Sequence, residues 1–137
     1  MNVRMELSRI LIREMNDYQI IELREAEGDR TFPIVIGLPE AQAIERRLRG
    51  IEIKRPQTHE LLMNVIEAFG GRLLSIEIND LSDHTFFAKL NLSTRDGQEL
   101  PIDSRPSDAI ALGIAKGVPI YVAEHVLEEA QSSADPS

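Results

Sequence analysis

Residues 102–112 constrain the fold more than any other stretch, because a strand has to stop and a helix has to begin within them. Pro106 suits the first position of a helix, since its φ is fixed near the helical value and its missing N–H would have no partner there. A residue before proline is driven to an extended conformation, so Arg105 ends the strand. The residues after Pro106 are small or apolar almost throughout, until Gly117 supplies a left-handed end. We predict a helix over 106–116 that is buried nearly all round.

Length and composition bound the class of protein. The 137 residues predict one domain over 1–130, with a disordered tail over 131–137. Apolar residues make up 42% and charged residues 28%, which is ordinary for a soluble protein, and no apolar run approaches the ~20 residues that span a bilayer. The first residues lead straight into a strand pattern, so we expect no secretory signal. The absence of cysteine excludes disulfides and thiolate metal sites, and fits the cytoplasm.

The formal charge of −8 limits how the chain could bind nucleic acid, because most of its surface would repel a polyanion. Contact would have to come from a local basic patch. The best candidate patch lies at the end of the first predicted helix and just after it, in Arg46, Arg47, Arg49 and Lys54. The same residues could equally be an ordinary solvated helix face, in which Glu45 pairs with Arg49 one turn later.

Hydrophobic periodicity predicts eleven elements in the order three strands, two helices, three strands, helix, strand, helix. Because the helices do not alternate with single strands, we expect an α+β fold with a mixed or largely antiparallel sheet. The first strand changes phase near residues 8–9, which predicts a bulge. Residues 80–84 contain two carboxylates and an imidazole that could bind a cation, but Asp and Ser are also turn formers, and we interpret the segment as a turn. Arg55-Pro56 and Arg105-Pro106 each precede a helix, which suggests an internal duplication.

The second predicted helix carries an apolar stripe and a polar start. Leu61, Leu62, Val65, Ile66 and Phe69 recur at helical spacing, with Thr58 as the predicted cap. His59 and Glu60 occupy the first turn, where the helix dipole disfavours an imidazolium. A neutral His59 could accept a proton or bind a metal, or could simply form a hydrogen bond with a neighbouring loop.

Three segments of the chain resemble blocks of the bifunctional nuclease domain family. Residues 103–112 with 117–122 are similar to the signature of that family, residues 55–62 to its second block, and residues 32–37 to one of its strands. The resemblance covers roughly residues 5–130. It implies a nuclease that acts on DNA or RNA, and it points to a homo-oligomer, most simply a homodimer. Adjacent apolar residues in two strands, Ile20 with Ile21 and Phe86 with Phe87, agree with a second buried face.

A nuclease needs an activated water and positive charge near the phosphate oxygens. Arg55 and Arg105 are candidate phosphate clamps, joined by Thr58 and Ser107 at the starts of their helices.

Hard oxygen ligands for Mg²⁺, Mn²⁺ or Ca²⁺ could come from Asp103 and Asp108, with Glu60 as a further candidate, while His59 acts as the base. Asp103 could instead pair with Arg105 to fix the corner, and Asp108 could be only a favourable charge at a helix start.

Two other classes of function stay open. The chain could be a non-catalytic interaction domain, or a sensor that binds an anionic ligand at the same helix starts without turnover. No glycine-rich phosphate loop, nucleophile elbow or zinc spacing occurs in the sequence to suggest a different enzyme.

Overall fold

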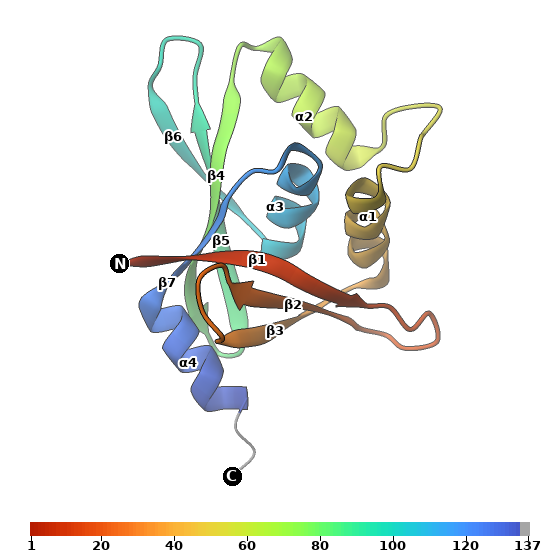
Figure 1. Ribbon diagram of the computed structural model, residues 1–137. Coiled ribbons are helices and arrows are strands. Elements are labelled where there is room, and N and C mark those ends of the chain that lie inside the picture. Colours follow the sequence, from red (N-terminus) through yellow and green to blue (C-terminus); the bar gives the residue numbers. More distant parts are fainter. Residues whose placement is uncertain (135–137) are drawn as a thin grey trace.

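The computed structural model describes residues 1–134, and a seven-stranded sheet runs through them (Figure 1). In chain order the elements are β1 (Asn2–Leu11), β2 (Gln19–Glu25), β3 (Thr31–Ile36), α1 (Leu38–Arg49), α2 (Thr58–Ala68), β4 (Arg72–Ser82), β5 (Thr85–Ser93), β6 (Glu99–Ser104), α3 (Pro106–Gly113), a 3₁₀ turn (Ile114–Lys116), β7 (Ile120–Ala123) and α4 (Glu124–Ala134). Apart from the 3₁₀ turn, this is the predicted order. The α+β prediction is confirmed.

The sheet has the strand order β3-β2-β1-β7-β4-β5-β6. Every neighbouring pair is antiparallel except β4 and β7, which run parallel, so the sheet is mixed but largely antiparallel. The predicted bulge in β1 is present, because the register with β2 shifts between Leu7 and Arg9. The turn predicted over residues 80–84 is shorter than expected. Asp83 and His84 have positive φ and join β4 to β5, whereas residues 80–82 belong to β4.

Each half of the sheet repeats one arrangement, a three-stranded meander followed by a helix. β1 to β3 lead into α1, and β4 to β6 lead into α3, with β7 between the two meanders. This repeat is not the predicted duplication, which compared Arg55-Pro56 with Arg105-Pro106. Arg105-Pro106 does join a strand to a helix, but Arg55-Pro56 lies in the loop before α2, which has no counterpart in the other half.

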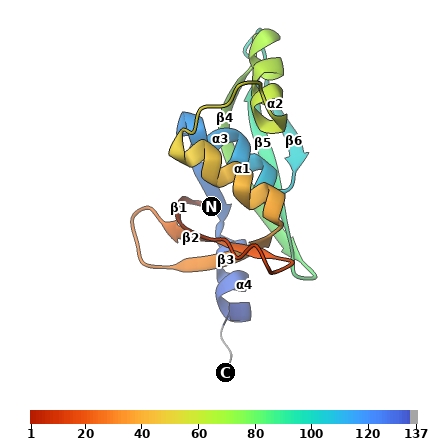
Figure 2. The ribbon, with the colours of Figure 1, turned by 90° about the vertical axis from the view of Figure 1, so that its right-hand side faces the viewer.

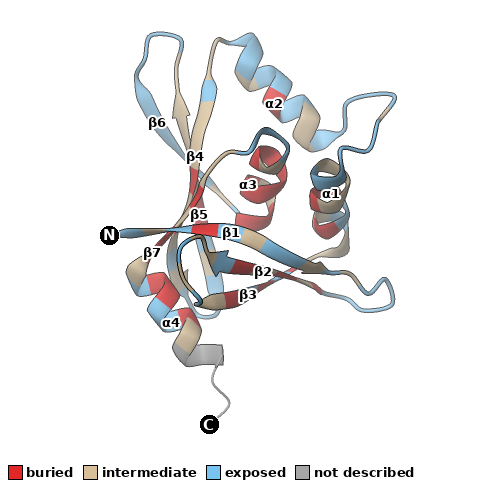
Figure 3. Cartoon of the chain, in the orientation of Figure 1, coloured by how far each residue is buried: buried red, intermediate tan, exposed pale blue. Residues whose placement is uncertain are grey.

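The helices α3 and α2 differ in how far their residues are buried. Seven of the eight residues of α3 are buried, as predicted, because α1, α2, β4 and β5 surround it (Figure 3). In α2 only Met63 is buried, and the predicted apolar stripe is largely exposed: Leu61, Leu62, Val65 and Phe69 face solvent. The second view shows α2 at the far end of the molecule, above α1 and α3 (Figure 2). Helical spacing identifies an apolar face, whereas the surrounding elements decide whether anything covers it.

The last helix is longer than expected, and Leu48 near the end of α1 is exposed. α4 continues to Ala134, four residues past the predicted domain end, and the Gln131 side-chain amide donates to the carbonyl of Thr31 in β3. Residues 135–137 of the predicted tail lie outside the described residues. Within residues 1–134 no helix is long and apolar enough to cross a membrane.

Candidate functional site

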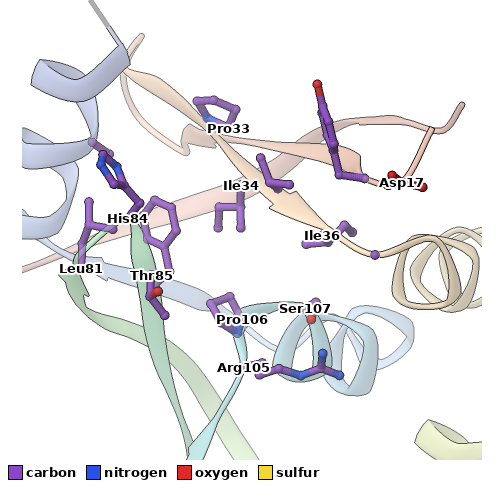
Figure 4. A pocket seen from close by; sticks show the side chains of 15 residues that line it. Asp17, Pro33, Ile34, Ile36, Leu81, His84, Thr85, Arg105, Pro106 and Ser107 are labelled. Atoms are coloured by element: carbon purple, nitrogen blue, oxygen red, sulfur yellow. The ribbon is translucent and has the colours of Figure 1, made fainter.

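Two pockets flank Arg105 at the start of α3. The first, the α2 pocket, has a volume of about 730 Å³ and lies between α2 and strands β5 and β6. The second, the α3 pocket, has a volume of about 760 Å³ and lies between β3, the β4–β5 turn and the start of α3 (Figure 4). Thr85, Phe86 and Arg105 line both. The two pockets are therefore neighbours that share one wall.

Three predicted site residues meet in the α2 pocket. His59 Nε2 lies 3.0 Å from Asp108 Oδ1, and the other Asp108 oxygen, Oδ2, accepts from Arg105 Nε at 2.8 Å. His59 comes from the first turn of α2, whereas Arg105 and Asp108 come from the N-cap and first turn of α3. His59 is only 12% exposed, while Arg105 is 64% exposed. The arrangement is an imidazole oriented by a carboxylate beside an accessible guanidinium.

The alternative in which Asp103 pairs with Arg105 does not occur in the structure. Arg105 instead bridges Asp108 in its own helix and Glu40 in the first turn of α1, with Nη1 3.0 Å from Glu40 Oε1. An N-cap side chain lies over the first turn of its helix, so the residue three positions later is nearer than one on the preceding strand. The hydrogen bond and charge of Asp108, helped by Glu40, raise the pKa of Arg105. A fixed cation therefore stands between the two pockets.

Glu60 belongs to a different network. Its carboxylate accepts from the Gln57 backbone amide at 3.1 Å and from Arg47 Nη1 at 2.9 Å, and Arg46 lies 3.6 Å away. Burial alone would raise the Glu60 pKa, but the Arg47 hydrogen bond and the charges of both arginines hold it below its ordinary value. Gln57 and Glu60 form a capping box, so Gln57 is the N-cap of α2 rather than the predicted Thr58. These contacts are those of a structural carboxylate.

The predicted basic patch does not form one surface. Arg47 is 7% exposed, and it donates through Nε and Nη2 to the carbonyls of Ala111 and Leu112 at the end of α3. Arg46 is also turned toward Glu60, and Arg49 pairs with Glu45 on the exposed side of α1. Lys54 is exposed in the following loop. Carbonyl groups at a helix end attract a guanidinium, so Arg47 is buried against the end of α3 and is not part of a basic surface.

The remaining candidates are divided. Thr58 and Asp103 line the α2 pocket, and Ser107 lines the α3 pocket. Arg55 is exposed in the loop before α2 and lines neither pocket. Of the two predicted phosphate clamps, only Arg105 lines a pocket.

No cluster of three or more His, Asp or Glu residues suited to a metal ion occurs within residues 1–134. The two predicted ligands differ in availability. Both oxygens of Asp108 already have partners, whereas Asp103 is exposed at the rim of the α2 pocket with no partner among the described residues.

Sequence reasoning missed Glu40 and the aromatic wall of the pockets. Glu40 sits three residues after the N-cap of α1, a position where an acidic residue is expected, but nothing local indicates that it reaches Arg105. Phe86 was predicted only as a strand residue. It stacks on the fully buried Phe32 with ring centroids 5.5 Å apart, which gives both pockets a rigid apolar side.

Comparison with known proteins gives a consistent assignment. The sequence pattern of the bifunctional nuclease domain family matches residues 21–135. An uncharacterized protein of Mycobacterium tuberculosis is 40% identical over 121 residues, which are 88% of this chain and 71% of that protein. Bifunctional nuclease 1 of Oryza sativa subsp. indica is 25% identical over 114 residues, 81% of this chain and 34% of that protein. Bifunctional nuclease 2 of Oryza sativa subsp. japonica is 29% identical over 106 residues, 74% and 32% of the two chains. The chain therefore spans about a third of the length of these rice relatives.

Proposed function

Because the chain belongs to the bifunctional nuclease domain family, we propose that it hydrolyses phosphodiester bonds of DNA, RNA or both in the α2 pocket. One observation carries the choice of pocket, the line of contacts from His59 through Asp108 to Arg105. A base, a group that orients it and a cation that can bind a phosphate are the minimum that phosphodiester hydrolysis requires.

Each side chain then has a defined task. Arg105 binds a non-bridging phosphate oxygen, since its guanidinium is accessible and permanently charged. Asp108 accepts from Nε2–H of neutral His59, which leaves Nδ1 to take a proton from water. The water oxygen forms a bond to phosphorus, the bond to one ester oxygen breaks, and the proton held on Nδ1 passes to that leaving oxygen.

A divalent cation is proposed as a partner of the substrate phosphate. Asp103 would hold it through a carboxylate oxygen, with Asp108 close by as the second candidate. When bound, such an ion supplies positive charge to the phosphate oxygens. Magnesium, manganese and calcium all take oxygen ligands, so the donor set alone does not choose among them.

The lining of the α2 pocket also suits a nucleotide. The rest of the lining is largely apolar and comes from side chains of α2, β5 and β6: Leu62, Ile66, Phe87, Leu90, Leu92 and Ile102. Aromatic and aliphatic surfaces accept any nucleobase by its flat face. Because this contact does not read sequence, we expect little preference between bases.

The test compares two histidines that each lie near an aspartate. His59→Ala should lower cleavage of fluorescently labelled nucleic acid by about 100-fold, because the base is lost. It should cost only about 1–2 kcal/mol of stability for one hydrogen bond. His125 lies 3.6 Å from Asp80 on an exposed surface, so His125→Ala is the matched control and should cleave like the wild type. Equal activity of both variants would contradict the assignment of His59.

A homodimer is the second proposal, and the exposed stripe of α2 supports it. Leu61, Val65 and Phe69 are 55%, 44% and 78% exposed and lie on one face, with no charged residue among them. Such a stripe is complementary to its own copy across a twofold axis. Pairing through the edge of β6 is less favourable because Pro101 has no N–H to donate.

Light scattering at micromolar concentration should give twice the monomer mass for the wild type. Phe69→Glu should give the monomer, because a charge would be buried in the interface. Leu48→Glu places the same charge at an exposed leucine of α1 and should stay dimeric. A monomeric wild type would refute the proposal.

The non-catalytic alternatives make a different prediction in the same assays. An interaction domain or an anion sensor would bind without cleaving in any of the three divalent metals, and His59→Ala would then behave as the wild type. The proposed compartment is the cytoplasm, which rests on the absence of cysteine.

A further inference from the structure

The α3 pocket is large enough for a nucleotide and is not used by the hydrolysis described above. Its volume of about 760 Å³ falls in the usual range of small-molecule sites. β3 supplies one side, the β4–β5 turn another, and the first residues of α3 close the end (Figure 4). Pro33, Ile34, Ile36 and Phe86 make most of it apolar, and the accessible ring of Tyr18 stands at its edge.

Ser107 is the polar group at the closed end. It is 94% buried, being 6% exposed, and its hydroxyl has no hydrogen-bond partner within the described residues. Figure 4 shows the Ser107 side chain beside Pro106 and below Ile36, among the side chains that line the pocket. The Ser107 oxygen is not among the fully buried, unpartnered polar atoms of residues 1–134, so it is open to the pocket, where a ligand can supply its partner.

The first backbone amides of α3 also lack a partner within the helix. α3 has no side-chain cap, and the amides of Ser107 and Asp108 lie in the first turn, where no acceptor exists within the helix. The Asp108 carboxylate does not serve them, because it is directed to His59 and Arg105 in the α2 pocket. The Ser107 amide, the Ser107 hydroxyl and the positive end of the helix dipole thus lie at the closed end of the pocket, and this set of groups favours an anion.

The charges around the pocket restrict which anion fits. Arg105 lies at one side of the closed end, with Glu40 already holding its Nη1. Asp17 lies at the rim, where it would repel a second negative group. A single phosphate at Ser107, with an uncharged planar group against the apolar wall and Tyr18, satisfies both ends of the pocket.

We propose that the α3 pocket binds one nucleotide of the substrate chain, with its phosphate at Ser107 and its base against β3 and Tyr18. Arg105 lines both pockets, so the nucleotide in the α3 pocket is the neighbour of the phosphate that is cleaved in the α2 pocket. The identity of the ligand rests on the proposed nuclease function, whereas the site itself rests on Ser107 and the uncapped helix.

The first experiment measures binding without cleavage. Adenosine 5′-monophosphate, adenosine and inorganic phosphate are titrated separately into the full chain while amide NMR resonances are followed. We expect the monophosphate to shift the amides of Ser107 and Asp108, and adenosine to bind more weakly by about 10-fold or more, since the charged hydrogen bonds are lost. Ser107→Ala removes a hydroxyl that has no partner, so the fold should be retained and the affinity for the monophosphate should fall by about 10-fold. Ser93→Ala, a change of the same kind outside both pockets, should leave the affinity unchanged.

The second experiment asks whether the ligand belongs to a chain. In a His59→Ala background, a short single-stranded oligonucleotide should lose affinity when Ser107→Ala is added. If the monophosphate binds in a Ser107-dependent way but the wild type cleaves no nucleic acid, the proposed nuclease function is refuted and the proposed nucleotide site is supported. Any of three results would overturn the proposal. The oligonucleotide could bind equally well with and without Ser107→Ala, adenosine could bind as tightly as its monophosphate, or the Ser107→Ala variant could bind the monophosphate like the wild type.

Discussion

Arg47→Ala should destabilise the protein by about 3–4 kcal/mol, because the change strands a carboxylate and two carbonyls at once. Arg47 Nη1 lies 2.9 Å from Glu60 Oε2, and Nη2 lies 2.9 Å from the carbonyl oxygen of Leu112. Nε donates to the carbonyl of Ala111. Breaking a buried ion pair costs about 3–5 kcal/mol, and we take the lower part of that range because Arg46 remains 3.6 Å from Glu60.

Thermal melts followed by circular dichroism measure this loss. At about 4 °C per kcal/mol for a domain of this size, the midpoint should fall by roughly 10–15 °C. Arg49→Ala is the matched control: it removes the same charge from the same helix, but its partner Glu45 is on the exposed side, so the midpoint should move by less than about 2 °C. If the free energy of unfolding of Arg47→Ala is within about 1 kcal/mol of the wild-type value, the buried network does not join α1, α2 and α3 as described.

Three further outcomes are expected. Denaturant melts of single and double variants should show coupling between Arg105→Ala and Asp108→Asn but additive losses for Arg105→Ala with Asp103→Asn, since only the first pair is in contact; coupling to Asp103 would contradict the observed pairing. Because the pKa of Glu60 is lowered in the folded state, its contribution to stability is complete above its unfolded pKa near 4.5 and is lost as pH falls through the folded pKa. Denaturant titrations at decreasing pH should therefore show a loss of stability in the wild type and a smaller loss in Glu60→Gln. Asp108→Asn should lose cleavage activity, and partial rescue by added Mg²⁺ would identify a metal ligand, whereas activity that only follows the folded fraction would assign Asp108 to orienting His59.

The order of the elements was predictable because the signals for it are local. Pro106 begins α3 and Gly117 ends the 3₁₀ turn that follows it, and the change of phase in β1 marks its bulge. Each of these signals acts through the conformations open to one or two residues, which do not depend on the rest of the fold. The same locality explains the error at Arg55-Pro56, because a dipeptide that favours an extended residue occurs in loops as readily as at the end of a strand.

The candidate site was predictable as a set of residues but not as a geometry. Placing His59 and Asp108 at helix starts followed from capping rules, and both do lie in first turns. The 3.0 Å contact between them joins residues 49 positions apart, and no periodicity contains that distance. For the same reason the sequence offered only Asp103, a near neighbour, as a partner for Arg105, whereas the fold provides the distant Glu40.

What the sequence alone determined is where strands and helices begin, where they end and which face of each is apolar, since proline, glycine, caps and alternation act over a few residues. What only the tertiary structure decided is which of those faces and charges are covered. Arg47 is buried because α3 presents its last carbonyls there, and Phe69 is exposed because no described element packs over that side of α2. Burial depends on the competition of whole elements for a limited core, and that competition also brought the starts of α1, α2 and α3 together around Arg105 and Asp108.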